Sequence, residues 1–184
     1  GEDVIPAFII VKYRDGAYNW YAYHKEAGTN NYFEYEPTAA AAFSSVVFGN
    51  QTNGTIRLGG DYVVSRDTGN YIAYCFAEVA GFSKFGSYTG NAPAGGTGST
   101  IPINCGFEPA FVMIKWTSGS VGYGAWGIWD NKRDTTNPNT KFLQANSTSA
   151  ELDLSAYGID FASNGFTVGA AGNDITNISG NSYI

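Results

Sequence analysis

Charged residues are scarce in this sequence of 184 residues: they make up 14% of it, and the formal net charge is −6. The lysines and arginines number ten and are scattered along the chain. Nucleic-acid phosphates are bound by clustered basic side chains, so this distribution argues against a nucleic-acid partner. Apolar runs are also short, and none approaches the roughly 18 residues that suggest a membrane-spanning helix. We therefore expect neither nucleic-acid binding nor membrane insertion.

Residue types that carry out chemistry are few as well. His24 is the only histidine, and the sequence contains no Gly-x-Ser-x-Gly nucleophile motif, no Cys/His cluster and no phosphate-binding glycine motif. Glu34 and Glu36 alternate along a predicted strand, which favours a solvated face over a catalytic pair. Cys75 and Cys105 could form one disulfide or remain two free, buried thiols. We predict no catalytic site, no metal and no cofactor, and so no enzyme.

Aromatic residues and glycine are abundant instead. Aromatics make up 16% of the chain, and there are 24 glycines, whereas good helix formers are sparse. Aromatic and β-branched side chains suit pleated, half-buried surfaces, and glycine suits the turns between strands. We therefore predict an all-β protein, a jelly-roll-like β-sandwich. The expected strands are 7–14, 18–25, 31–36, 43–48, 54–58, 71–78, 84–89, 110–116, 124–130, 141–145, 165–168 and 182–184. Asn53-Gly54 and Asn164-Gly165 have the composition of tight hairpin turns.

The sequence also contains an internal repeat. Four pairs of segments match in the same order, with an offset that grows from 103 to 111 residues, as loop insertions between fixed strands would produce. The pairs are 6–12 with 109–115, 20–24 with 126–130, 53–56 with 164–167, and 69–72 with 180–184. We predict two tandem copies, at 1–80 and 106–184, that form one sandwich or two, joined by a strand and a Gly-rich loop at 81–105.

The two copies differ at one end. Copy one continues into the strand-like segment 73–78, whereas copy two has no equivalent segment within this sequence. A strand missing from a sheet leaves an open edge, which another chain can fill. This difference favours a unit that needs neighbours over an independent binding domain.

The first strand of copy one is apolar on both faces. Alternation places Ile9 and Val11 on one face, and Phe8 and Ile10 on the other. Such a strand is expected at the centre of a sheet that is covered on both sides. We expect a second sheet to cover one face, and either a sheet or a neighbouring subunit to cover the other.

Aromatic side chains are the best candidates for function. Trp20 and Trp126 occupy equivalent positions in the two copies, and for them we favour packing in the core. Tyr23 and Trp129 are also equivalent, and their side chains point to the opposite face. If that face is open, the rings of Tyr21, Tyr23 and Trp129 could stack on sugars or anchor a protein interface; if it is not, they are core residues.

Long segments of the chain resemble a known family. Residues 71–91, YIAYCFAEVAGFSKFGSYTGN, are similar to a stretch of tail-fibre and virion-associated proteins of marine bacteriophages. In those proteins the stretch leads into counterparts of GFEPAFVMIK at 106–115 and WDNKRD at 129–134. The segments IDFASNGF at 159–166 and GNSYI at 180–184 fit the same pattern. The resemblance is close over most of 71–184 and looser over copy one.

The resemblance implies an extracellular protein of a virion or cell-surface appendage. It implies assembly with copies of itself or neighbouring fibre subunits, and it leaves room for contact with cell-surface glycans. It supplies no catalytic residues. The sequence therefore predicts a structural module of an extracellular fibre, with a phage tail or virion fibre as the favoured setting. The alternative is a monomeric, lectin-like glycan-binding module, with Tyr23 and Trp129 as stacking platforms.

Overall fold

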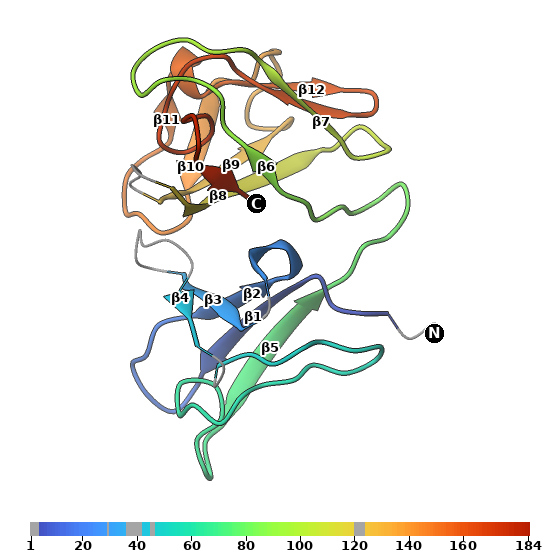
Figure 1. Cartoon of the computed structure of the whole chain (residues 1–184), viewed down its shortest axis with the longest axis vertical. Coiled ribbons are helices and arrows are strands. Elements are labelled where there is room, and N and C mark those ends of the chain that lie inside the picture. The colour runs from blue at the N-terminus through green and yellow to red at the C-terminus, as the bar shows by residue number, and fades with distance from the viewer. Residues whose placement is uncertain (1–3, 29, 36–41, 45–46, 120–123) are drawn as a thin grey trace. The chain divides into compact units, whose positions relative to one another are not determined.

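The computed structural model describes residues 4–28, 30–35, 42–44, 47–119 and 124–184. They form strands, turns and loops, with two short 3-10 helices, η1 (Lys25–Ala27) and η2 (Ser155–Tyr157). The prediction of an all-β fold is confirmed. The chain divides into two compact units: unit 1 comprises 1–79 and 83–86, and unit 2 comprises 80–82 and 87–184 (Figure 1). Neither helix has the length or the apolar character needed to cross a bilayer, and the described residues contain no other candidate.

Unit 1 is built on one antiparallel sheet with its strands in the order β4-β3-β2-β1-β5. The strands are β1 (Phe8–Tyr13), β2 (Tyr21–His24), β3 (Asn31–Glu34), β4 (Ala42–Phe43) and β5 (Tyr71–Phe76). Alternation sends Ile9 and Val11 of the central strand β1 to one face, where they pack with Phe48 and Val64. The core of unit 1 therefore lies between the sheet and the turns and loops of segment 47–64.

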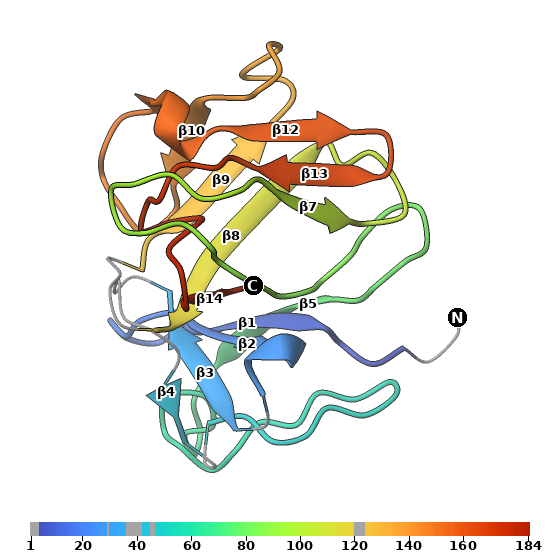
Figure 2. The same cartoon turned by 45° about the horizontal axis from the view of Figure 1, so that its top comes forward.

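Unit 2 contains two sheets. The larger has the order β11-β10-β9-β8-β14-β6, and the smaller has the order β12-β13-β7. The strands are β6 (Tyr88–Thr89), β7 (Ile101–Asn104), β8 (Phe111–Ser118), β9 (Trp126–Asp130), β10 (Lys141–Gln144), β11 (Leu152–Asp153), β12 (Ile159–Ala162), β13 (Gly165–Val168) and β14 (Ser182–Tyr183). Figure 2 shows β7, β13 and β12 as a layer in front of β8 and β9. Val112 and Ile114 of β8 pack with Ile159 and Val168 of this second layer, so unit 2 is a β-sandwich.

The two large sheets share a strand order. In unit 1 the order is β4-β3-β2-β1-β5, and the strands at the corresponding places of unit 2 are β11-β10-β9-β8-β14. Four consecutive strands of each unit form a meander, which differs from the strand order of a jelly roll. The pairing of β14 with β8 shifts register between Ser182 and Tyr183, where copy two has one residue more than copy one. These agreements support the internal repeat inferred from the sequence.

A lysine and a tryptophan meet at the same place in both sheets. The Nζ atom of Lys12 lies 5.9 Å from the ring centroid of Trp20, and that of Lys115 lies 5.6 Å from the ring centroid of Trp126. Each ammonium group also donates a hydrogen bond to the backbone carbonyl two residues before its tryptophan. The two sheets thus share a cation–π contact as well as a strand order.

Several predicted strands are shorter than expected or absent. Segment 54–58 contains isolated bridges only, and 84–89 contains only the two residues of β6. Of segment 43–48, the described residues place Phe43 alone in a strand, and residues 45–46 lie outside the described residues. Three strands, β7, β11 and β12, were not predicted. Proline is uncommon in strands, so Pro102 made a strand at β7 hard to predict from the sequence. It is tolerated because β7 lies at the edge of its sheet.

The Gly-rich segment predicted as a connection belongs to unit 2. From Ser87 onward the segment 81–105 lies in that unit, where β6 pairs with β14 and β7 pairs with β13. Its loop is held by backbone hydrogen bonds, from the Gly98 N–H to the Ala170 carbonyl (2.8 Å) and from the Ser179 N–H to the Ala92 carbonyl (2.7 Å). The predicted boundary between the copies therefore differs from the boundary between the units.

The two Asn-Gly sites differ in detail. Asn53-Gly54 is a tight turn between the bridged residues Thr52 and Thr55, as predicted. At the second site the turn residues are Ser163 and Asn164, because Gly165 is already paired with Ala162. A Cβ atom on Gly165 would lie 1.9 Å from the carbonyl oxygen of Ile103 on β7. Glycine is therefore required here by the close approach of β7.

We predict that Gly165→Ala destabilises unit 2 by about 1–3 kcal/mol, because β7 must move away from β13 to make room for the methyl group. Gly86→Ala is the matched control, since a Cβ there meets no atom within 4 Å. Urea denaturation followed by tryptophan fluorescence measures both. Equal stability of the two variants would contradict the close-approach argument.

Candidate interaction surface

The three aromatic residues predicted as contact residues are buried. Tyr21 and Tyr23 are 8% and 9% exposed and lie in the core of unit 1, and Trp129 is 0% exposed in the core of unit 2. The Trp129 ring stacks on Phe142 with centroids 5.4 Å apart, and Tyr23 lies 5.9 Å from Phe48. The interpretation of these rings as sugar-stacking platforms is therefore wrong. Their side chains lie on the core side of each sheet, so they are core residues, which was the other alternative considered from the sequence.

The opposite face of each large sheet, which we name the second face, is also apolar. In unit 1 the direct cross-strand pairs Phe8–Phe76, Ile10–Tyr74 and Lys12–Ile72 lie on it. The three β5 residues are exposed, with Tyr74 47% accessible. The Phe76 ring lies 5.8 Å from Phe8, and the Tyr74 ring lies 6.3 Å from Trp20. The side chains of β5 thus form an aromatic surface supported by the sheet.

The second face of unit 2 repeats this chemistry with different residues. Phe111 is 56% exposed, and Met113 beside it on the same face is half-buried. Ile128 and Leu143, which are paired across β9 and β10, continue the apolar strip and are half-buried as well. A contiguous apolar surface of this kind is typical of a face that contacts another protein.

Two strand edges adjoin these faces. β5 is the last strand of its sheet, so its outer edge has no neighbour among the described residues. On one side, β8 is paired with β9 from Phe111 to Lys115. On its other side, Trp116 and Ser118 are paired with β14. Backbone hydrogen bonds between Lys115 and Ile184 extend this second pairing by one residue. Sequence reasoning predicted an open edge from the missing strand, but it did not identify the exposed aromatics around it.

The single histidine has a structural environment. His24 is buried between the rings of Phe8 and Phe85, and its Nδ1 accepts a hydrogen bond of 3.2 Å from the Glu26 N–H. Burial is the main cause that lowers the pKa of His24 to about 4, and the nearby Lys25 charge lowers it further. His24 is therefore a buried imidazole, neutral at pH 7, that caps η1.

Glu78 beside it makes three polar contacts. It contacts Lys25 at 2.9 Å and Lys84 at 3.1 Å, and it accepts a hydrogen bond of 3.1 Å from the Phe85 N–H. Desolvation raises its pKa, but these hydrogen bonds outweigh that effect and lower the pKa to about 2. Through its contacts with Lys84 and Phe85, Glu78 binds segment 83–86 to the rest of unit 1, which explains why this segment belongs to that unit.

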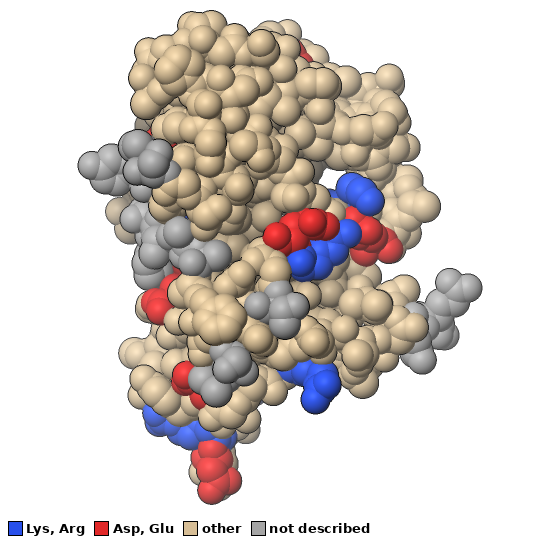
Figure 3. Space-filling model, in the orientation of Figure 1, with Lys and Arg blue, Asp and Glu red and all other residues tan. Residues whose placement is uncertain are grey.

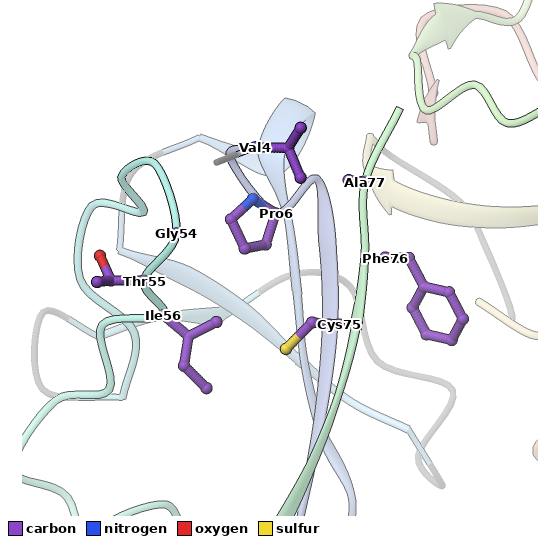
Figure 4. Close-up of a pocket in the computed structure, with 8 residues that line it drawn as sticks. All are labelled: Val4, Pro6, Gly54, Thr55, Ile56, Cys75, Phe76 and Ala77. Atoms are coloured by element: carbon purple, nitrogen blue, oxygen red, sulfur yellow. The ribbon is translucent and has the colours of Figure 1, made fainter. Parts of the chain in front are cut away.

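No group of three or more His, Cys, Asp or Glu side chains suited to a metal ion occurs within the described ranges. Cys75 is a free thiol, and it is exposed rather than buried as expected. Figure 4 shows the Cys75 thiol in an open hollow with Pro6 and Ile56, while Phe76 points away from it. On the face shown in Figure 3, acidic and basic side chains gather in small mixed groups and most of the surface carries neither.

We predict that the two faces of the unit 2 sheet respond differently to truncation of an aromatic side chain. Trp129→Ala should destabilise unit 2 by about 3–5 kcal/mol, because it empties a fully buried site. Phe111→Ala, on the exposed face, should change stability by only about 0.5 kcal/mol. Chemical denaturation measures both variants. Similar losses would mean that the assignment of core face and second face is incorrect.

We also predict that unit 1 loses stability as the pH falls from 7 to 5. The folded pKa of His24 is about 4, below its ordinary value of 6.5, so the unfolded chain binds more protons than the folded chain between these values. His24→Gln should remove this part of the pH dependence. An NMR titration of the single imidazole checks the cause directly, and a folded-state pKa near 6.5 would refute it.

Comparison with known proteins places the chain in a family. No curated protein matches it, and no solved structure does. The sequence model of one family, DUF7483, matches residues 1–184. Because that match spans the whole sequence, this chain belongs to the DUF7483 family, a domain of unknown function.

Proposed function

We propose that this chain is a structural module of an extracellular fibre. The observation that carries the proposal is the apolar second face of each large sheet, together with the exposed aromatics of β5, whose outer edge is covered by no strand among the described residues. Such a surface is unusual in a monomeric protein, since exposed apolar patches and unpaired strand edges promote association. In a fibre, neighbouring modules cover both features.

The setting proposed for the module is a phage tail or virion fibre. It rests on the resemblance of residues 71–184 to tail-fibre and virion-associated proteins, and so does the extracellular location. The partners proposed are copies of the same chain or neighbouring fibre subunits. The low charge and the mixed distribution of acidic and basic side chains support partners that are proteins rather than nucleic acid (Figure 3).

A catalytic role forms no part of the proposal. His24 and Glu78 are engaged in holding η1 and segment 83–86, and their surroundings account for their shifted pKa values. Contact with host glycans remains compatible with a fibre, but the residues first considered for it, Tyr21, Tyr23 and Trp129, are inside the cores. A monomeric glycan-binding module, the alternative, would need other rings.

We predict that the purified chain self-associates in a concentration-dependent manner, and that Tyr74→Ser weakens the association about tenfold by removing an exposed ring from the second face. Tyr62→Ser is the matched control, because Tyr62 is 55% exposed but lies outside the sheet. Sedimentation velocity and negative-stain imaging give the readout. A strict monomer over the whole concentration range would contradict the fibre function and favour the monomeric alternative.

A further inference from the structure

Arg66 of unit 1 is surrounded by tyrosine rings. Its guanidinium carbon lies 5.2 Å from the ring centroid of Tyr13, 5.2 Å from that of Tyr18 and 5.5 Å from that of Tyr62. Each of these distances is within the range over which a cation is attracted to an aromatic ring. The guanidinium also donates a hydrogen bond of 2.8 Å to the Tyr18 hydroxyl. These contacts together hold the Arg66 side chain in a defined position.

The backbone at Arg66 is fixed as well. Its N–H donates a hydrogen bond of 2.9 Å to the Tyr71 hydroxyl, which in turn donates one of 2.7 Å to the Tyr62 carbonyl. The Arg66 carbonyl accepts a hydrogen bond of 3.1 Å from the Gly69 N–H. Tyr71 therefore fixes the positions of Tyr62 and Arg66 relative to each other within the loop that precedes β5.

The turn that follows Arg66 has a strained backbone. Thr68 has a φ of 59°, in the left-handed region that β-branched residues seldom occupy. Backbone strain of this kind persists only where the surrounding contacts enforce it, and it is concentrated at sites that bind ligands. The strain at Thr68 is thus an observation, independent of the ring contacts, that makes this loop a candidate ligand site.

The guanidinium of Arg66 is open to solvent despite these contacts. Arg66 is exposed, and no ion pair found among the described residues involves it, although Asp67 follows it in the sequence. The Tyr18 hydroxyl occupies one of its five N–H donors, so most of them remain for a ligand. Arg133 of unit 2 differs, because two carboxylates and a backbone carbonyl use its donors within the chain.

An exposed aromatic ring lies beside this cation. Tyr62 is 55% exposed, and its ring meets Tyr18 edge-on, with the centroids 5.7 Å apart. The neighbouring loop residues Ser65, Asp67 and Asn70 are polar and exposed, so this loop lacks the apolar centre that is typical of a protein interface. A ring and a cation on a polar surface instead suit a sugar that carries a negative charge. The C–H groups of such a sugar pack on the ring, and its carboxylate binds the guanidinium.

We propose that Arg66 and Tyr62 form a binding site for an acidic sugar, a carboxylate-bearing unit of a polysaccharide. The carboxylate accepts hydrogen bonds from the remaining donors of Arg66, and the sugar ring packs on Tyr62. Tyr13, Tyr18 and Tyr71 are positioning residues, which order the site before the ligand binds and so reduce the entropy lost on binding. The site lies within unit 1 and goes beyond the proposed function, because it does not require assembly.

The test is a calorimetric titration of the full chain with trigalacturonate, a chain of three carboxylate-bearing sugars. We expect a dissociation constant of about 1 mM or less at low salt, and weaker binding as salt is added. Arg66→Gln should weaken binding at least about tenfold, and Tyr62→Ser, which alters only an exposed ring, at least about threefold. Arg57→Gln is the matched control: it removes the same charge from an exposed arginine that has no cation–π contact among the described residues, and it should change binding less than about twofold.

Two further probes separate the sugar from the charge. The methyl ester of trigalacturonate keeps the rings without the charge, and a glutamate hexapeptide keeps carboxylates without the rings; both should bind at least about tenfold more weakly than trigalacturonate. The acidic-sugar site is refuted if trigalacturonate does not bind, if Arg66→Gln and Arg57→Gln weaken binding equally, or if the peptide binds as tightly as the sugar. Sedimentation without any sugar tests the fibre function separately, so either proposal can fail while the other stands.

Discussion

Hydrogen bonding between a central strand and its two neighbours sets which side chains of each unit can be buried. β1 lies between β2 and β5, and β8 lies between β9 and β14. Because alternate side chains leave a strand on opposite faces, these pairings commit Ile9 and Val112 to the cores and Phe8 and Phe111 to the second faces. The cores, the exposed aromatics and the bare edge all follow from this arrangement.

The cover of the core face differs between the units, although their large sheets share a strand order. In unit 2 a second sheet, β12-β13-β7, packs on β8 through Ile159 and Val168. In unit 1 turns and loops supply the apolar side chains of Phe48 and Val64 instead. A repeated sheet can therefore be combined with different second layers, provided that each layer supplies enough apolar area to cover the central strand.

The Lys–Trp pairs show how far the similarity between the two large sheets extends. Lys115 is fully buried, and burial lowers its pKa to about 8, whereas Lys12 at the same position is only partly buried. A buried ammonium group is costly unless it is hydrogen-bonded, and here both lysines keep a carbonyl acceptor and an aromatic ring. The two sites thus share their contacts while differing in burial.

The sequence was sufficient for the fold class and for the central position of the first strand, but not for the faces. Alternation shows that Phe8 and Ile9 lie on opposite faces of their strand; it does not show which face is the core, since both are apolar. That depends on segment 47–64, whose apolar residues have no strand periodicity. The sequence also does not show how segment 81–105 is attached: its glycines permit close backbone contacts, such as Gly98 with Ala170, which composition alone does not distinguish from a flexible linker.

The edges of the two large sheets differ in how they are protected. β14 is flanked by β6, where the rings of Tyr88 and Tyr183 stack at 5.1 Å, so unit 2 protects its own edge at that point. Monomeric β proteins guard edges with charged residues, proline or bulges. β5 has none of these: it carries Ile72, Tyr74 and Phe76 on an exposed face and no charged residue along its length. Among the described residues no strand covers the outer side of β5, and this exposed apolar strand is the surface that the proposed assembly would cover.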